Sequence, residues 1–323
     1  MTDDAIRISD LSVRYGRTIA VDHVALGVAK GGVYALVGRN GAAKSSLVRC
    51  LLGQQKPAAG SVALFGEDSW SRRPALMQRI GVVTEDADAP PEMSVGSIAR
   101  FCSRLYDKWD QDSVEVRLRT FGVPMTSRFG SLSKGQKKQV SLALALAIAP
   151  ELLVLDDPTL GLDVVARKSL FEEVIGDLAD RGTTIFITTH DLSGVETFAD
   201  RVGMMEHGKL VLDEDVDALK SRFRRIRFAA QPVAIDTSAL RPMAMRSWGG
   251  GAEAIVSNYD NLVFERMRGA SNIGAAEVEA MSLEEIFIAI AGGNPLSHCR
   301  SPAARRAGTM MKPKQPTIIR CSR

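Results

Sequence analysis

A glycine-rich stretch between an apolar run and a helix-type segment constrains this chain more than any other feature. Val33–Val37 is continuously apolar and of strand length, which is typical of a strand buried on both faces. Gly38–Ala43 follows, and Lys44–Leu52 has helix-forming composition until Gly53 ends it. A strand, a loop and a helix in this order open an α/β unit. The backbone N–H groups of such a loop can wrap a phosphate at the helix N-terminus.

The loop nearly matches a phosphate-binding pattern, G-x-x-x-x-G-K-[ST]. Gly38–Ser45 fits this pattern except at the second fixed glycine, where Ala43 stands. In the pattern, the lysine (here Lys44) reaches the outer phosphates and the hydroxyl of Ser45 binds Mg²⁺. An ordinary glycine-rich turn that caps a helix is the alternative, and the loop alone does not decide between the two.

Two later segments carry polar groups suited to the same chemistry. Leu152–Leu155 is another buried-strand run and ends in Asp156 and Asp157, which are placed to hold Mg²⁺ and to position a water molecule. Leu132–Gln136 puts a serine and a glycine directly before a long helix of Ala and Leu, whose N-terminus attracts anions. The alternatives are an ordinary Asp-Pro turn and a simply N-capped helix.

Strand-type and helix-type segments alternate up to about residue 220, which predicts a mostly parallel sheet covered by helices. A helical insertion is expected near residues 95–150. After Phe223 the pattern changes to short β-like runs, and a closing helix is expected at the end. The β-like runs are Ile226–Ala229, Ala254–Val256 and Leu262–Glu265, and the helix is Leu283–Ile290. We therefore expect three parts: 1–222, an accessory α+β domain at 223–293, and a disordered basic tail at 294–323.

Composition narrows the class of protein. The chain has 323 residues, of which 45% are apolar and 24% charged, as in a globular protein with a sizeable core. The formal net charge is +3, but residues 294–323 hold seven Lys/Arg and no acid, so the body is mildly acidic and no nucleic-acid partner is expected. The four cysteines show no metal-ligand spacing and fit a reducing cytoplasm. Neither a secretory signal nor a membrane-spanning segment is expected, because the longest charge-free apolar run is Ser141–Pro150.

Taken in chain order, these motifs resemble the nucleotide-binding subunit of an ATP-binding cassette (ABC) transporter. The resemblance covers roughly residues 4–220 and rests on Tyr15, the 38–45 loop, Glu85, Leu132–Gln136, Asp156–Asp157, Asp163 and His190. Three further pieces are similar to the bacterial exporter-type branch: Ile80–Glu85, Tyr106–Asp110 and Met281–Phe287. The implied fold is α/β, a P-loop NTPase core of ABC type with a helical subdomain.

The resemblance also implies roles for individual residues. ATP and Mg²⁺ would be the cofactors. The nucleotide would contact Tyr15 (stacked on adenine), Gly38, Asn40, Gly41, Ala42, Ala43, Lys44, Ser45 and Ser46. From the opposite subunit, Ser133, Gly135 and Gln136 would contact the γ-phosphate, and Asp163 would lie at the dimer seam. Ser45, Glu85 and Asp156 would serve the metal, and Asp157, His190 and Glu85 the hydrolysis.

The implied activity is ATP hydrolysis that powers transport. ATP would join two cassettes, which are either two copies of this chain or this chain and a paralogue, and hydrolysis would release them. An integral-membrane permease on a separate chain would convert this cycle into transport, with loop 85–110 as the docking region. The expected location is cytoplasmic, peripheral on the inner face of the cell membrane. The alternatives are an ATP-gated regulatory dimerisation module, a degenerate cassette with little hydrolysis, and a cassette that serves translation or repair.

Three residues depart from the family pattern, and all three belong to the chemistry. Ala43 replaces a glycine, and if that position needs φ > 0 the alanine costs roughly 1–2 kcal/mol. Asp157 stands where the family has glutamate and is shorter by about 1.5 Å. Glu85 stands where the family has glutamine and brings another carboxylate to the metal and phosphates. One hypothesis is therefore slow turnover; the other is an aspartate that reaches through a relaxed loop, with normal to moderate turnover.

Overall fold

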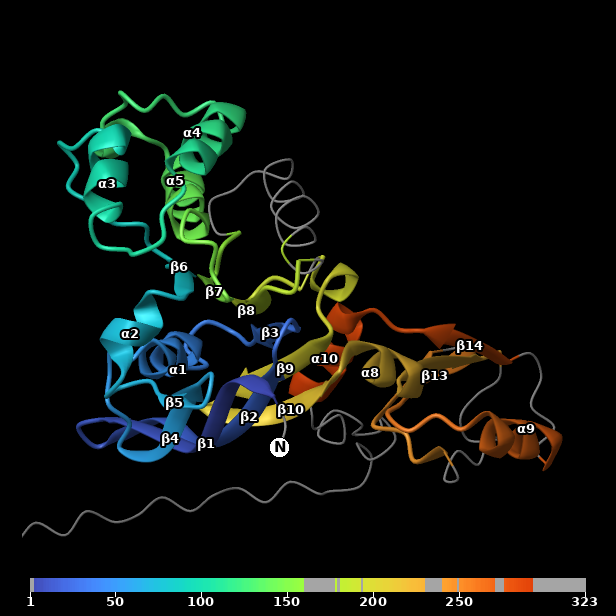
Figure 1. Ribbon diagram of the computed structural model, residues 1–323. Coiled ribbons are helices and arrows are strands. Elements are labelled where there is room, and N and C mark those ends of the chain that lie inside the picture. Colours follow the sequence, from blue (N-terminus) through green and yellow to red (C-terminus); the bar gives the residue numbers. More distant parts are fainter. Residues whose placement is uncertain are drawn as a thin grey trace, which may run out of the picture.

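The computed structural model describes residues 3–159, 178, 181–192, 194–229, 240–248, 250–270 and 276–292. Figure 1 shows this part of the chain as two sheets packed around a helix, a cluster of helices beyond one end of the sheets, and a C-terminal sheet to the side. Among the described helices, none is long and apolar enough to cross a bilayer.

The central sheet contains the buried strand that precedes the glycine-rich loop. Its strand order is β10-β9-β3-β8-β7-β6. The strands are β3 (Val33–Val37), β6 (Ile80–Val83), β7 (Leu152–Asp156), β8 (Thr184–Thr189), β9 (Arg201–Glu206) and β10 (Lys209–Asp215). All neighbours pair in parallel except β9 and β10, which form an antiparallel hairpin. Every residue of β3, β7 and β8 is buried, as expected for central parallel strands.

A second, antiparallel sheet covers helix α1 (Lys44–Leu51) from the other side. Its strand order is β2-β1-β4-β5, with β1 (Asp4–Tyr15), β2 (Thr18–Ala29), β4 (Ala59–Leu64) and β5 (Glu67–Asp68). One apolar cluster joins β1, the central sheet and α1 through Ile6, Leu36 and Leu47. The short helix α2 (Arg73–Met77) adds Leu76 to this cluster before the chain enters β6. Helix α1 is therefore held between the two sheets.

The chain leaves the central sheet after β6, forms a helical subdomain, and returns at β7 (Figure 1). The helices are α3 (Val95–Cys102), α4 (Gln111–Thr120) and α5 (Lys134–Leu146). They enclose a core of their own that includes Val95, Val114 and Val140. The helical insertion expected near residues 95–150 is present, and its last helix, α5, begins at Lys134.

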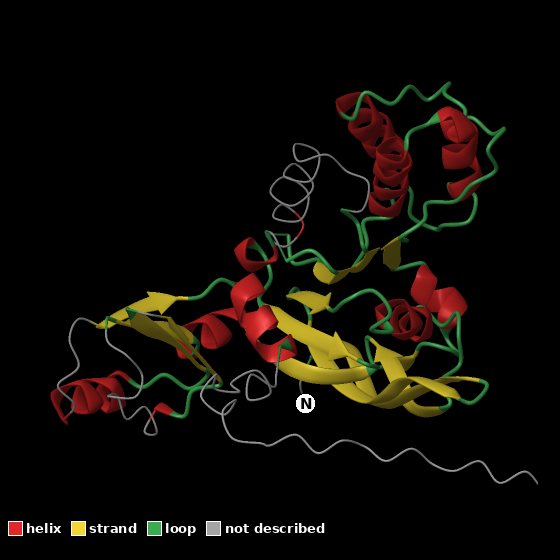
Figure 2. Ribbon diagram, turned by 180° about the vertical axis from the view of Figure 1, so that it is seen from behind, coloured by secondary structure: helices red, strands yellow, loops and turns green. Residues whose placement is uncertain are grey.

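The C-terminal part builds a third sheet, seen edge-on in Figure 2, and then returns to the core. Helix α8 (Val216–Arg222) leads into strands in the order β12-β13-β11-β14. They are β11 (Arg224–Phe228), β12 (Ala244–Trp248), β13 (Gly251–Val256) and β14 (Ala276–Ala280), with α9 (Asn261–Ala270) covering one face. Helix α10 (Leu283–Ala291) places Leu283, Ile286 and Phe287 in the same apolar cluster as β3, β7 and β8.

The expected strand at Leu262–Glu265 is wrong, because these residues lie in α9. Asp260 accepts hydrogen bonds from the backbone N–H groups of Leu262 and Val263 and so caps the helix start. Phe264 and Met267, three residues apart, form its buried face. The segment Val165–Leu178 has the composition expected of a helix, but it lies outside the described residues except for Leu178, which is helical.

The basic run at Lys220–Arg227 is used within the fold. Arg222 pairs with Glu214 at 2.6 Å, Arg225 with Glu285 at 2.9 Å, and Arg227 with Glu279 at 2.6 Å. Lys220 pairs with Glu196 at 3.3 Å. Arg225 joins the third sheet to α10, and Arg227 joins β11 to β14 within that sheet. Lys220 and Arg222 hold α8 to Glu196 and to Glu214 of β10, so the run serves the packing of the C-terminal part.

Gly81 on β6 lies where α5 packs closely against the central sheet. A Cβ at Gly81 would lie 2.7 Å from the carbonyl oxygen of Ala145, which is backbone and has little freedom to move. We expect Gly81→Ala to lower the free energy of unfolding by about 1–3 kcal/mol, measured by chemical denaturation. Gly269→Ala is the matched control, because that position on α9 has open space and the added methyl should be neutral or stabilising. Equal effects of the two substitutions would contradict this packing.

Candidate functional site

The glycine-rich loop turns tightly at the carboxyl end of β3. A Cβ at Gly38 would lie only 2.5 Å from the carbonyl oxygen of Met205 on β9, so no larger residue fits there. The N–H of Gly38 donates to the carbonyl of Thr189 at 3.3 Å, and the N–H of Ala42 donates to the carbonyl of Arg39 at 3.0 Å. The loop is thus fixed to the ends of its two neighbouring strands.

The loop opens directly onto the N-terminus of α1. The N-cap residue is Ala43, which has no side-chain acceptor for the N–H groups of the first turn. The first N–H groups of a helix have no partner within the helix, and the helix dipole places positive potential at the same end. The site therefore offers N–H donors to an anion from outside.

Ala43 adopts the left-handed conformation, with φ 72° and ψ 20°. This is the conformation in which the family glycine is free of strain and alanine is not. Position 43 therefore does need a positive φ, and alanine in place of glycine costs on the order of 1–2 kcal/mol there.

Lys44 turns back over the loop that precedes it. Its Nζ donates to the carbonyl oxygen of Gly38 at 2.6 Å and lies 3.4 Å from that of Arg39. Burial lowers the pKa of this ammonium, and the nearby carboxylates of Asp157 and Asp156 oppose that shift. A buried cation whose hydrogen-bond partners among the described residues are neutral carbonyls is well placed to accept an anion as a further partner.

The acidic residues lie at the same edge of the sheet. The hydroxyl of Thr188, on β8, donates to Asp156 Oδ1 at the end of β7. Asp157 follows in a left-handed conformation with φ 47°, and its N–H donates to the carbonyl of Thr188 at 2.9 Å. Its Oδ2 lies 2.6 Å from Nδ1 of His190, which stands at the end of β8. Its other oxygen, Oδ1, is buried and has no hydrogen-bond partner within the described structure.

A cleft of about 750 Å³ brings these groups together. It is lined by Thr18, Ile19 and Ala20 of β2, residues 40–46 and Arg49 of the loop and α1, Glu85, Asp156, Asp157, His207 and Gly208. Most of the expected nucleotide, metal and catalytic residues therefore share one cavity. Its size is in the range that holds a small organic ligand.

Several expected residues, Gly38 and His190 among them, are not among the described residues that line the cleft. Tyr15 pairs with Thr18 across the β1–β2 turn, and its hydroxyl donates to Gln55 Oε1 at 2.7 Å and lies 3.3 Å from Ser46 Oγ. Ser133 and Gln136 form a capping box at the start of α5, where Ser133 is exposed. Among the described lining residues, neither these two nor Gly135 contributes to the cleft. Asp163 lies outside the described residues.

Sequence reasoning missed three residues of the site. Lys138 is buried on α5 and its Nζ donates to the carbonyl oxygen of Asp157. Thr188 holds Asp156, and His207 lines the cleft from the β9–β10 turn. Lys138 had a usable signal, because it stands at helical spacing from the buried residues Leu142 and Ala145. Thr188 and His207 gave none, since their roles depend on strand pairing.

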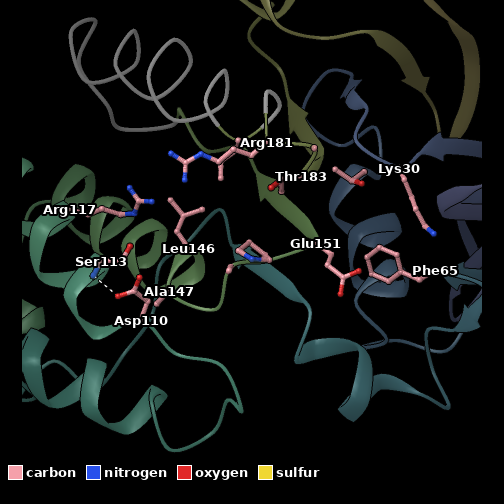
Figure 3. A pocket seen from close by; sticks show the side chains of 15 residues that line it. Lys30, Phe65, Asp110, Ser113, Arg117, Leu146, Ala147, Glu151, Arg181 and Thr183 are labelled. Atoms are coloured by element: carbon pink, nitrogen blue, oxygen red, sulfur yellow. Dashed lines mark hydrogen bonds between the residues drawn. The ribbon is translucent and has the colours of Figure 1, made fainter.

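A second hollow, of about 450 Å³, lies at the amino ends of β7 and β8, whereas the first cleft lies at the carboxyl ends of the parallel strands (Figure 3). Its acidic groups already have structural roles. Asp110 caps α4 by accepting from the N–H of Ser113 at 2.9 Å, and Glu151 forms two hydrogen bonds with Arg79 at 2.7 and 2.8 Å. The hollow does not include the glycine-rich loop or the acids at the ends of β7 and β8.

The glycine-rich loop before α1, the buried Lys44 and the acids at the end of β7 together define a P-loop α/β nucleotide-binding protein. Comparison with known proteins gives the family: residues 21–160 match the family described as ABC transporter. The bacitracin transport ATP-binding protein of Bacillus licheniformis is 32% identical over 222 residues, which are 68% of this chain and 72% of that protein. The Nod factor export ATP-binding protein I of Rhizobium sp. (strain N33) is 30% identical over 302 residues, 90% of this chain and 98% of that protein.

Solved structures agree with this result. A structure described as the ATP-binding subunit of an ABC transporter has a TM-score of 0.62 at 25% identity and covers 67% of this chain and 92% of its own. A dimeric ATP-binding cassette in a post-hydrolysis state with ADP and Pi has a TM-score of 0.59 at 20% identity, with 65% and 98% covered, and is similar in fold.

The chain belongs to the ABC transporter family, as its ATP-binding subunit. It is an ATPase subunit whose nucleotide is ATP and which powers a separate membrane permease. The post-hydrolysis cassette of the same fold is itself a dimer. The expected family and fold class are thereby confirmed.

The strain at Ala43 can be measured directly. We expect Ala43→Gly to raise the free energy of unfolding by about 1 kcal/mol, because glycine adopts φ 72° without the Cβ clash. Ala42→Gly is the matched control: Ala42 is buried and outside the left-handed region, so the same change should destabilise by about 1 kcal/mol. Denaturant titrations that gave the two variants the same sign would contradict the strain.

Proposed function

We propose that this chain binds Mg-ATP in the 750 Å³ cleft and hydrolyses it with Asp157 and His190 as the motor of an exporter. The observation that supports this most is the convergence of the α1 N-terminus, the Lys44 ammonium and Asp157 on one cavity, with His190 bound to the Asp157 carboxylate. Anion donors and a carboxylate that can accept a proton are the two requirements of phosphoryl transfer to water.

Each part of the nucleotide has a proposed partner. The N–H groups of loop 38–46 and Lys44 would hold the β- and γ-phosphates. Tyr15, which is 44% exposed beside Ser46, would stack on adenine. Residues 1–222 would be the unit that binds nucleotide, and residues 223–293 would be an accessory unit.

The oxygen ligands fit Mg²⁺. Ser45 and Glu85 line the cleft together with Asp156, whose carboxylate is held by Thr188. Among the described residues there is no cluster of three or more acids, histidines or cysteines that would form a complete metal cage. A site without a complete cage suits Mg²⁺, because this ion keeps several waters and binds one or two carboxylates together with the phosphates. When bound, it would neutralise charge on the phosphates; Ser45 and Asp156 would hold it, and Glu85 would face it.

Hydrolysis would use the free oxygen of Asp157. As a water oxygen bonds to the γ-phosphorus, Asp157 Oδ1 accepts a proton from that water, and the bond to the bridging oxygen breaks with its electron pair leaving on ADP. His190 holds Oδ2 and so orients the carboxylate. Lys44 and the loop N–H groups stabilise the charge that develops on the phosphates.

The exposed start of α5 would complete the site of a second cassette. Ser133, Gly135 and Gln136 stand at a helix N-terminus and are not among the described residues that line the cleft of their own chain. ATP held by one chain would therefore join it to α5 of another. Asp163 would lie at the same seam.

A permease would dock on the helical subdomain near residues 85–110. Phe101 and Leu105 are exposed there, at 58% and 54%, and large apolar side chains that remain exposed favour a partner. Docking on a permease would place this chain on the inner face of the cell membrane. Export is the proposed direction, because the match to the Nod factor export protein extends over 90% of the chain.

ATP-driven pairing has a direct test. Asp157→Asn should retain the loop and Lys44 but lose the proton acceptor, so with Mg-ATP it should persist as a dimer, measured as a doubled mass by light scattering. Ser133→Ala in the same background should shift the protein back toward monomer, because one γ-phosphate contact is lost. A monomeric Asp157→Asn protein with bound ATP would contradict the pairing.

The two departures near the phosphates should limit the rate. We expect Ala43→Gly with Asp157→Glu to hydrolyse ATP at least about tenfold faster than the wild type, since misplacement by 1 Å can cost about 10²-fold. Phosphate release at saturating Mg-ATP measures this. Equal rates would show that the aspartate already reaches the water.

A further inference from the structure

Lys138 is a buried cation that the proposed chemistry does not use. Lys138 is only 6% exposed, and its Nζ donates to the backbone carbonyl oxygen of Asp157. Lys138 belongs to α5, whereas Asp157 follows β7, so this contact joins the helical subdomain to the edge of the central sheet.

Burial of the Lys138 ammonium costs free energy unless hydrogen-bond acceptors or opposite charges surround it. Burial lowers the pKa of Lys138, and the carboxylates of Asp157 and Glu85 oppose that shift. The acids at the cleft therefore favour the charged lysine, and Asp157 supplies its hydrogen-bond acceptor.

Asp157 depends on its contacts to keep its conformation. A non-glycine residue with φ 47° is strained, and such a conformation persists only where neighbours determine it. Three contacts do so: the N–H of Asp157 bonds to Thr188, its carbonyl accepts from Lys138, and its carboxylate meets His190. The first and third contacts come from β8, and Lys138 alone reaches Asp157 from α5.

We propose that Lys138 is a positioning residue for hydrolysis, which fixes the main chain of Asp157 so that its short carboxylate points to the nucleotide. This inference rests on the proposed role of Asp157 in hydrolysis. One consequence concerns the pair of cassettes. Ser133 is the N-cap of α5, and Lys138 lies five residues further, about 7.5 Å along the axis. The helix that would touch the second chain's ATP therefore also holds the acid of its own site.

The test compares two neighbouring lysines on α5. Lys138→Met keeps most of the side-chain volume but removes the donor, and Lys137→Met is the matched control because its Nζ lies over the ring of Phe129, 5.3 Å from the centroid. With the full chain and Mg-ATP, we expect Lys138→Met to lower kcat about 30- to 100-fold and to leave KM within about threefold. Lys137→Met should leave both within about twofold.

Two further variants separate positioning from a structural role. In an Asp157→Ala chain, Lys138→Met should lower the residual rate no further, because effects that act through one residue are not additive. Lys138→Arg, which keeps a charged donor, should retain at least about a third of the wild-type kcat.

Three outcomes would overturn the inference. The first is a Lys138→Met rate equal to that of Lys137→Met. The second is a parallel loss of kcat, ATP affinity and thermal stability. The third is an equal fold-loss in the Asp157→Ala background. A failure of the proposed function is distinguishable, because the wild type would then hydrolyse no faster than Lys44→Ala.

Discussion

The structure depends on the place where β3 ends and α1 begins. There the first N–H groups of a helix meet no side-chain cap, and the hydrogen-bond partners of a buried lysine, within the part of the chain that the structure describes, are backbone carbonyls. Both are unfavourable in an isolated protein and favourable beside polyphosphate. The two sheets that enclose α1 keep this end of the helix open to the cleft, and Gly38 allows β9 to approach it.

Parallel pairing then decides what surrounds this point. Because β3, β7 and β8 run in the same direction, their carboxyl ends share one edge of the sheet, where Asp156, Asp157 and His190 follow. The acids are held in turn by neutral or cationic groups: Thr188 on Asp156, and Lys138 and His190 on Asp157. Two buried ammonium groups, of Lys44 on α1 and Lys138 on α5, thus lie near the same carboxylates.

Sequence periodicity predicted the parts of the fold that local patterns determine. Val33–Val37 and Leu152–Leu155 are buried strands, and the loop and helix between Gly38 and Leu51 stand where the glycine pattern put them. The antiparallel β2-β1-β4-β5 sheet was not predicted, because its pairing joins residues as distant as Ile6 and Leu64. The strand expected at Leu262–Glu265 failed because three consecutive apolar residues fit either element, and the cap at Asp260 decided for the helix.

The same distinction applies to the site. The sequence order of the motifs indicated which residues to examine, but not that Asp157 turns onto His190 or that Lys138 reaches it from another subdomain. The central claim is that Lys44 and its loop bind ATP for hydrolysis. Its most direct test is Mg-ATP binding and phosphate release by the purified chain, with Lys44→Ala as the reference. We expect binding and turnover in the wild type and loss of turnover in the variant. Turnover that survives Lys44→Ala unchanged would contradict it.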